Sequence, residues 1–279
     1  MTSLPLALVT VLAQLGAAAA PATTQEFLAT AHAATVRYQD LRVAIADGYR
    51  AVGPDFPGMG EHWVHPGLLV SGQLDAARPQ ILEYAVLEGR RALVGVAYAA
   101  LVRDGEVPDA FPVARDAWHF HGGTVDEESF VLSHIGAGHD HPAGPRLAVL
   151  HAWVWLANPA GVFATDNWTL PYARVGFRAP PAAPIAAARA LSLASGGDAY
   201  LDVLVRALSR PDSDQAAALR TVVGAYRGKV EERLRPWARG VELGGENVAG
   251  LAALWAELCA AFDTVAGPRI AARLEPLKE

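Results

Sequence analysis

The stretch Arg146–Trp168, RLAVLHAWVWLANPAGVFATDNW, is the part of the sequence around which the expected fold is arranged. It begins with an apolar run and reaches a chain reversal at Asn158-Pro159. The length of the run and its tryptophan and valine content favour a strand over a buried helix. One histidine, His151, interrupts the run. An imidazole in such a position is either a core residue with a hydrogen-bond partner or a metal ligand.

The residues before this stretch predict a helix, a loop and two strands. Thr23 and Glu26 fit a capping box, and apolar residues then recur at helical spacing until Gly48 or Gly53. Residues 53–67 contain four glycines and three prolines, so they predict an irregular loop. Residues 79–101 predict two strands, QILEYAV and RALVGVAYAAL, which a Leu-Glu-Gly-Arg turn joins.

The residues after the proline cluster at 180–184 have helical periodicity instead. Amphipathic helices are expected at about 183–195, 198–209, 213–236 and 246–266. The fold class expected for the whole chain is therefore α+β: a small mixed or antiparallel β core with an N-terminal helix, followed by a helical C-terminal region. We expect a histidine-rich α+β domain at 23–178 and a helical region at 179–279, the latter serving as a cap or as the contact of a homodimer.

The N-terminal residues 1–22 form a candidate signal peptide. Leu4–Ala20 is an uncharged apolar run with small residues at its end, as in a cleavage site, but no basic residue precedes Arg37. The location therefore stays open between a periplasmic or secreted protein, if the segment is a signal peptide, and a cytoplasmic one. The run is too short and too rich in alanine to predict a stable membrane span.

Charge and histidine are unevenly distributed along the chain. The formal net charge is −6, and both the whole deficit and all nine histidines lie within residues 1–178. No basic stripe occurs, which argues against a nucleic-acid partner. The single cysteine, Cys259, excludes a disulfide framework and a CxxC metal pair. An acidic region rich in histidine suits a bound cation.

Four histidines are the candidate ligands of one zinc or copper ion: His62, His119, His121 and His151. His119 and His121 are two residues apart, so on a strand both imidazoles face the same side. Three imidazoles with an open coordination position suit zinc or copper, and either ion lowers the pKa of a bound water. Each histidine has a plain alternative as a core or loop residue with a hydrogen-bond partner, so the prediction depends on the set.

Three acidic residues are candidates for proton transfer or for orienting an imidazole: Glu61, Glu127 and Glu128. Glu61 precedes His62, and neighbouring side chains on an extended segment point apart, so Glu61 is not expected to bind the same ion. A second cluster, His134, His139 and His141, is interpreted as polar residues of a Gly-rich loop. Cys259 lies on an apolar helical face and is interpreted as a core residue.

Three motifs carry a resemblance. They are Gly60–Trp63 (G-x-H-W), Leu93–Tyr98 (L-V-G-V-x-Y) and Leu150–Phe163 (L-H-x-W-x-W-x-x-N-P-x-G-x-F). In these the chain resembles a group of uncharacterised bacterial proteins that are often exported. The resemblance covers roughly residues 50–178 and implies no activity.

Two functions are therefore expected as alternatives. The first is a metal-binding protein that acts on a small molecule, either as a metal-dependent hydrolase or as a copper redox enzyme. The second is a non-catalytic protein that binds a small molecule in a pocket lined by histidines and by Trp63, Trp118, Trp153 and Trp155. The two differ in geometry, because a metal site needs imidazole nitrogens that converge on one point about 2 Å from each.

Overall fold

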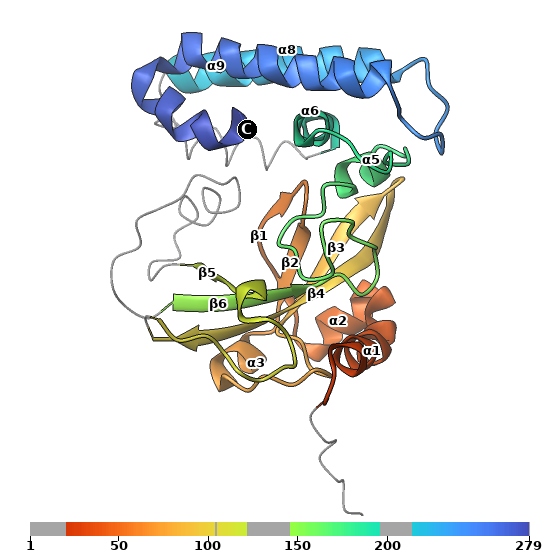
Figure 1. The fold of residues 1–279 in the computed structure, drawn as a ribbon, viewed down its shortest axis with the longest axis vertical. Helices are drawn as coiled ribbons and strands as arrows, with labels where there is room; N and C mark the ends of the chain where they lie inside the picture. The colour runs from red at the N-terminus through yellow and green to blue at the C-terminus, as the bar shows by residue number, and fades with distance from the viewer. Residues whose placement is uncertain (1–20, 104, 122–145, 196–213, 279) are drawn as a thin grey trace, which may run out of the picture.

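The computed structural model describes residues 21–103, 105–121, 146–195 and 214–278. In this part of the chain a six-stranded antiparallel sheet is accompanied by helices before and after it, so the predicted α+β class is confirmed (Figure 1). The strands lie in the order β1-β2-β3-β4-β6-β5: β1 (Arg50–Phe56), β2 (Gly60–Val64), β3 (Ile81–Leu87), β4 (Arg90–Val102), β6 (Arg146–Ala152) and β5 (His119–His121).

The helices are α1 (Thr24–Thr35), α2 (Leu41–Asp47), α3 (Pro66–Ser71), α5 (Leu170–Arg174), α6 (Ile185–Ser195), α8 (Asp214–Leu234) and α9 (Glu246–Lys278), with short 3-10 turns at η1 (Val36–Gln39) and η2 (Arg115–Ala117). The capping box of Thr23 and Glu26 is present. The helix expected from Thr23 onward is divided, because η1 follows α1 and Asp40 caps a new helix, which ends at Gly48 with a positive φ.

The irregular loop predicted for residues 53–67 is wrong, since most of this segment forms the β1–β2 hairpin. The glycines serve the hairpin instead of breaking it. Gly53 has a φ of 72° within an irregular stretch of β1, and Gly60 has a φ of 103° where β2 begins. A Cβ on Gly60 would meet the carbonyl oxygen of Tyr84 on β3. Glycine therefore lets β2 lie against β3 at this point.

The two strands predicted within residues 79–101 are confirmed as β3 and β4. Leu87 pairs with Arg90, and the two turn residues, Glu88 and Gly89, both have positive φ, as a tight hairpin turn requires. The register shifts once, directly after Glu83, which pairs with Gly95 while Tyr84 pairs with Leu93. This bulge lies in the middle of the sheet, beside the polar cluster described below.

The strand predicted in the central stretch is also confirmed, but β6 ends at Ala152. His151, Trp153 and Trp155 do not share one strand face, because the chain turns after Ala152. Trp153 donates a hydrogen bond to the carbonyl of Ala164, whereas Trp155 donates one to Thr35 and stacks on His32 of α1. Trp153 therefore contacts the segment that follows β6, whereas Trp155 contacts α1.

The two faces of the sheet differ in character. One face packs against α1 and α2 through a core of aromatic and aliphatic side chains that includes Phe27, Tyr49, Tyr84, Tyr98 and Leu150. The opposite face carries a smaller aliphatic cluster: Ile81, Ala97, Ala99 and Val149. Polar side chains also lie on this second face. They lie next to Ala97 and Ala99, whose small side chains leave space for them.

The C-terminal helices form a layer beyond one end of the strands, where α8 and α9 run side by side and α6 packs against both (Figure 1). The helices predicted at 183–195, 213–236 and 246–266 are confirmed, although α9 extends further than expected; the one at 198–209 lies outside the described residues. The hydrophobic core of these helices also includes Phe56 of β1, Met59 of the β1–β2 turn and Tyr172 of α5. These residues connect the helical layer to the sheet.

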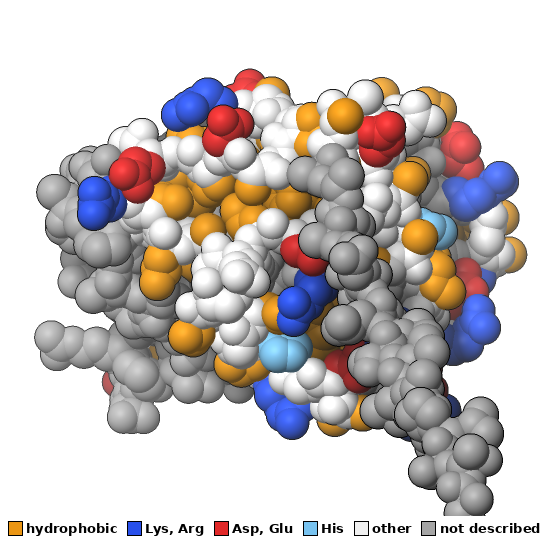
Figure 2. Space-filling view, turned by 90° about the horizontal axis from the view of Figure 1, so that it is seen from below, with side chains coloured by type: hydrophobic (Ala, Val, Ile, Leu, Met, Phe, Trp, Pro, Cys, Tyr) orange, Lys and Arg blue, Asp and Glu red, His pale blue; other side chains and the backbone are white. Residues whose placement is uncertain are grey.

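Within the described residues, one segment, Glu246–Val265 of α9, is long and apolar enough to cross a membrane by length and composition. It also packs against α6 and α8, as a core helix does. Figure 2 shows another face of the molecule, on which hydrophobic side chains form a continuous area and charged side chains of both signs are scattered around it.

Candidate metal centre

Three strands contribute a cluster of side chains that could hold a metal ion to the second face of the sheet. His62 comes from β2, Glu83 from β3 and His151 from β6. His62 and Glu83 are directly paired across β2 and β3. His151 is paired with Ala97 of β4, the strand that separates β3 from β6. Since paired residues and residues two apart share a face, all three side chains project to the same side.

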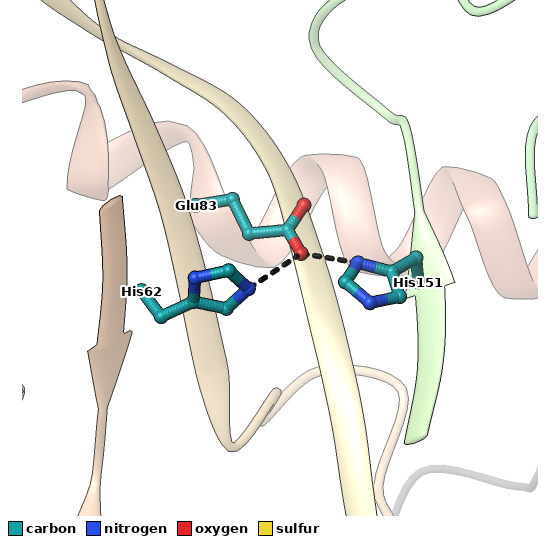
Figure 3. A group of neighbouring side chains, drawn as sticks. All are labelled: His62, Glu83 and His151. Carbon is teal, nitrogen blue, oxygen red and sulfur yellow. Dashed lines mark ion pairs between the residues drawn. The ribbon is translucent and has the colours of Figure 1, made fainter. Parts of the chain in front are cut away.

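The Glu83 carboxylate lies between the two imidazoles (Figure 3). His62 Nε2 is 3.9 Å from Glu83 Oε1, and His151 Nδ1 contacts the same oxygen. One ligand atom from each of the three residues lies within 4.8 Å of the others. Donor atoms this close, from two imidazoles and a carboxylate, can hold a single transition-metal ion.

Small residues on β4 make this arrangement possible. Gly95 lies opposite Glu83, and a Cβ at this position would meet Glu83 Oε2. Ala97, two residues further along β4, lies opposite His151. Because β4 presents only hydrogen and methyl groups here, the carboxylate on β3 and the imidazole on β6 meet across it.

The cluster is removed from solvent. Glu83 is fully buried, and His151 and His62 expose 1% and 5% of their surfaces. Neither carboxylate oxygen of Glu83 accepts a hydrogen bond from any residue that the structure describes. Burying a carboxylate is unfavourable unless hydrogen-bond donors or a cation compensate for the lost water. Among the described residues the nearby imidazoles can supply this compensation, and so can a bound cation.

Burial also determines the protonation of His62. Burial is the largest cause, and together with the neighbouring His151 it lowers the pKa of His62 to about 4, against the opposing effects of the Glu83 charge and a hydrogen bond to the backbone of Gly60. The imidazole is thus neutral at pH 7, which is the form that binds metal ions. Phe56 of β1 packs edge-on against this ring, with centroids 5.6 Å apart.

The HxH pair lies directly beside the cluster. His119 pairs with Val149, two residues before His151, and therefore projects from the same face. The rings of His119 and His151 are stacked at 5.0 Å, and His119 Nε2 is 3.1 Å from His121 Nε2. All four histidines predicted from the sequence are thus brought to one region, but the tight three-residue group contains Glu83 with His62 and His151.

The carboxylates predicted for proton transfer are not found in this cluster. Glu61 pairs with Tyr84 on the opposite face of β2 and β3, and it accepts hydrogen bonds from Trp63 and Arg91. Glu127 and Glu128 lie outside the described residues, as do His134, His139 and His141. The one predicted carboxylate that the structure describes is therefore tied to the sheet's other face.

Two acidic residues near the site, Glu83 and Asp166, were not predicted from the sequence. Glu83 is the only charged residue in QILEYAV, a strand whose residues are buried on both faces, and a charged residue in such a strand must have a partner. Asp166 lies beside Gly58, close enough for the Glu83 charge to affect it. Burial of its carboxyl raises the pKa of Asp166, although the residue as a whole is exposed. No pattern in the sequence connects Asp166 with β3.

The tryptophans expected to line a pocket lie in separate cores. Trp63, Trp118 and Trp155 belong to the aromatic core on the face covered by α1 and α2. Trp153 packs with Ala85, Val94 and Leu170. These indoles therefore contribute to packing at different places and do not surround the histidine cluster.

No protein-family model, curated protein or solved structure matches this chain. The geometry of the cluster is therefore the basis for the function proposed below.

His62 should make the metal-free protein less stable as the pH falls from about 6.5 to about 4, while the raised pKa of Asp166 acts in the opposite direction over part of this range. The pKa of His62 is lowered on folding, so in this range the unfolded chain binds a proton that the native state does not, and stability rises with pH. A shift from 6.5 to about 4 corresponds to about 3 kcal/mol in the free energy of unfolding. Urea denaturation at several pH values measures this change. The difference in the free energy of unfolding between the wild type and His62→Gln isolates the contribution of His62 and should change by about 3 kcal/mol over this range; a difference that does not vary with pH would contradict the assignment.

Proposed function

We propose that this protein binds one zinc ion through His62, Glu83 and His151. The observation that carries the proposal is the position of the Glu83 carboxylate, which is fully buried, contacts two imidazoles and has no hydrogen-bond donor among the described residues. A divalent cation at this point would neutralise the carboxylate and take up the facing imidazole nitrogens. A single buried ion pair between Glu83 and a protonated His151 is the competing explanation.

The ligand set favours zinc over an electron-transfer copper site. Two imidazoles and one glutamate are a known set for catalytic zinc, which keeps a fourth position for water. Electron-transfer copper sites use a thiolate, and Cys259 is buried in α9 within the helical layer. Ferrous iron takes the same set of two histidines and one carboxylate, so elemental analysis of the purified protein would distinguish these ions.

We infer that the open coordination position supports metal-assisted hydrolysis. A tetrahedral zinc ion with three protein ligands has a fourth position for a water molecule, and zinc lowers the pKa of such a water to about 7. His62 and His151 would supply neutral donors, and Glu83 would reduce the charge of the ion. The substrate class that follows is a small molecule with an ester, amide or phosphoester bond.

Glu83→Gln should weaken zinc binding by about 100-fold or more, because the amide keeps the size of the side chain but removes its negative charge. Glu61→Gln is the matched control, since Glu61 lies on the neighbouring strand and on the other face of the sheet. Competition with a chromophoric chelator measures both affinities on the full chain. Equal affinities in the two variants would show that Glu83 is not a ligand and that the buried ion pair is the better explanation.

Gly95→Ala should also weaken zinc binding while the sheet still forms. The added methyl group would meet Glu83 Oε2 and displace the carboxylate from the imidazoles. Gly228→Ala on α8 is the control, because a methyl group there has no neighbouring atom within 4 Å. Zinc affinity and thermal unfolding are measured on both variants. A Gly95→Ala protein that folds and binds zinc as tightly as the wild type would contradict this geometry.

The zinc-loaded protein should hydrolyse activated esters or phosphoesters, lose this activity on chelation and regain it when zinc is restored. Glu83→Gln should lower the rate in parallel with the bound zinc, whereas Glu61→Gln should not. A protein that binds zinc through the cluster but hydrolyses none of these compounds would leave the metal a structural role.

A further inference from the structure

His119 and His121 form a pair with its own geometry. Both lie on β5, and alternation along the strand directs them to one face while Trp118 and Phe120 pack with the aromatic core on the other. His121 is buried and His119 is half-buried. The Nε2 atoms are 3.1 Å apart, and the rings are nearly perpendicular, at 81°. The two imidazoles therefore converge through their Nε2 edges.

This separation fits two ligands of a shared ion. Zinc–nitrogen bonds of about 2.0–2.1 Å at a tetrahedral angle place two ligating nitrogens about 3.3 Å apart. Histidines two residues apart on a strand reach such a point without any change in the backbone. The competing explanation is a hydrogen bond between neutral imidazoles in which one Nε2 carries the proton, and this explanation requires no ion.

We propose that His119 and His121 bind a second transition-metal ion beside the first, so that the face of the sheet holds a two-metal centre. The second ion would lie on the β5 side of His151, whose ring stacks on that of His119 at 5.0 Å. The pair supplies two protein ligands, and water or substrate completes the coordination. The pair can be tested alone, but the two-metal centre rests on the function proposed above.

A two-metal centre narrows the class of substrate. Neighbouring divalent ions can bind the attacking water and the leaving oxygen of one substrate, as in metal-dependent phosphatases and aminopeptidases. Two cations also neutralise the charge of an anionic substrate group. The substrate class that follows is a small phosphoester or a peptide-like amide. A phosphoester is favoured, because its negative charge is neutralised by the two cations.

The experiment counts bound ions in the full-length, metal-stripped protein. Zinc is added in equilibrium dialysis, and the number bound and both affinities are measured for the wild type, Glu83→Gln, and the double variant His119→Gln/His121→Gln. A control with His134, His139 and His141 all changed to glutamine removes the histidines of the Gly-rich sequence, and His32→Gln removes one that stacks on Trp155. Copper(II) electron paramagnetic resonance then tests whether two bound ions are close enough for their spins to couple.

The expected result is two zinc ions in the wild type and in both controls. The double variant should keep one ion with an affinity within about threefold of the wild type, since its first site is intact, and it should lose the spin coupling. Glu83→Gln should keep the weaker ion, bound through His119 and His121. Normal thermal unfolding of the double variant confirms that β5 still pairs.

Other results would overturn one proposal or the other. A single ion in the wild type that the double variant still binds would refute the second site and leave the zinc site of His62, Glu83 and His151 in place. A single ion that either set of substitutions abolishes would mean that all these residues serve one ion. An ion that depends on His119 and His121 but not on Glu83 would refute the proposed function while keeping the pair as a metal site.

Discussion

The interaction on which the site depends is the burial of the Glu83 carboxylate in the middle of the sheet. A charged group without solvent raises the free energy of the native state unless other groups or an ion compensate for it. The surrounding residues fit this requirement: Gly95 leaves room for the carboxylate, and imidazoles approach it from two sides. A methyl or larger side chain at the centre of β4 would remove the space that the charge occupies.

The register of the sheet then determines which residues meet. His62 reaches Glu83 by direct pairing, and His151 reaches it across a whole strand because Gly95 and Ala97 are small. The bulge after Glu83 lies at this position and changes the register by one residue beyond it. Since side chains alternate between faces along a strand, a bulge at another residue would change which side chains share the face of His151.

Much of the fold was predictable from local patterns. The capping box at Thr23, the hairpin of β3 and β4, and the strand around His151 all follow from periodicity and turn residues. The hairpin at residues 53–67 was not predicted, because its glycines and prolines indicate a loop when the neighbouring strand that requires Gly60 is unknown.

The site was predictable only in part. His62 and His151 were selected by residue type, and both occur in the cluster. Glu83 could have been selected as a lone acid within the buried strand QILEYAV. Its pairing with His62 and its approach to His151 depend on long-range strand order, which one sequence does not contain. That order has a consequence for assembly of the chain: His62, Glu83 and His151 meet only after β6 has joined β4. An ion held there would therefore bind the finished sheet in preference to the unfolded chain, and its free concentration would shift the folding equilibrium by mass action.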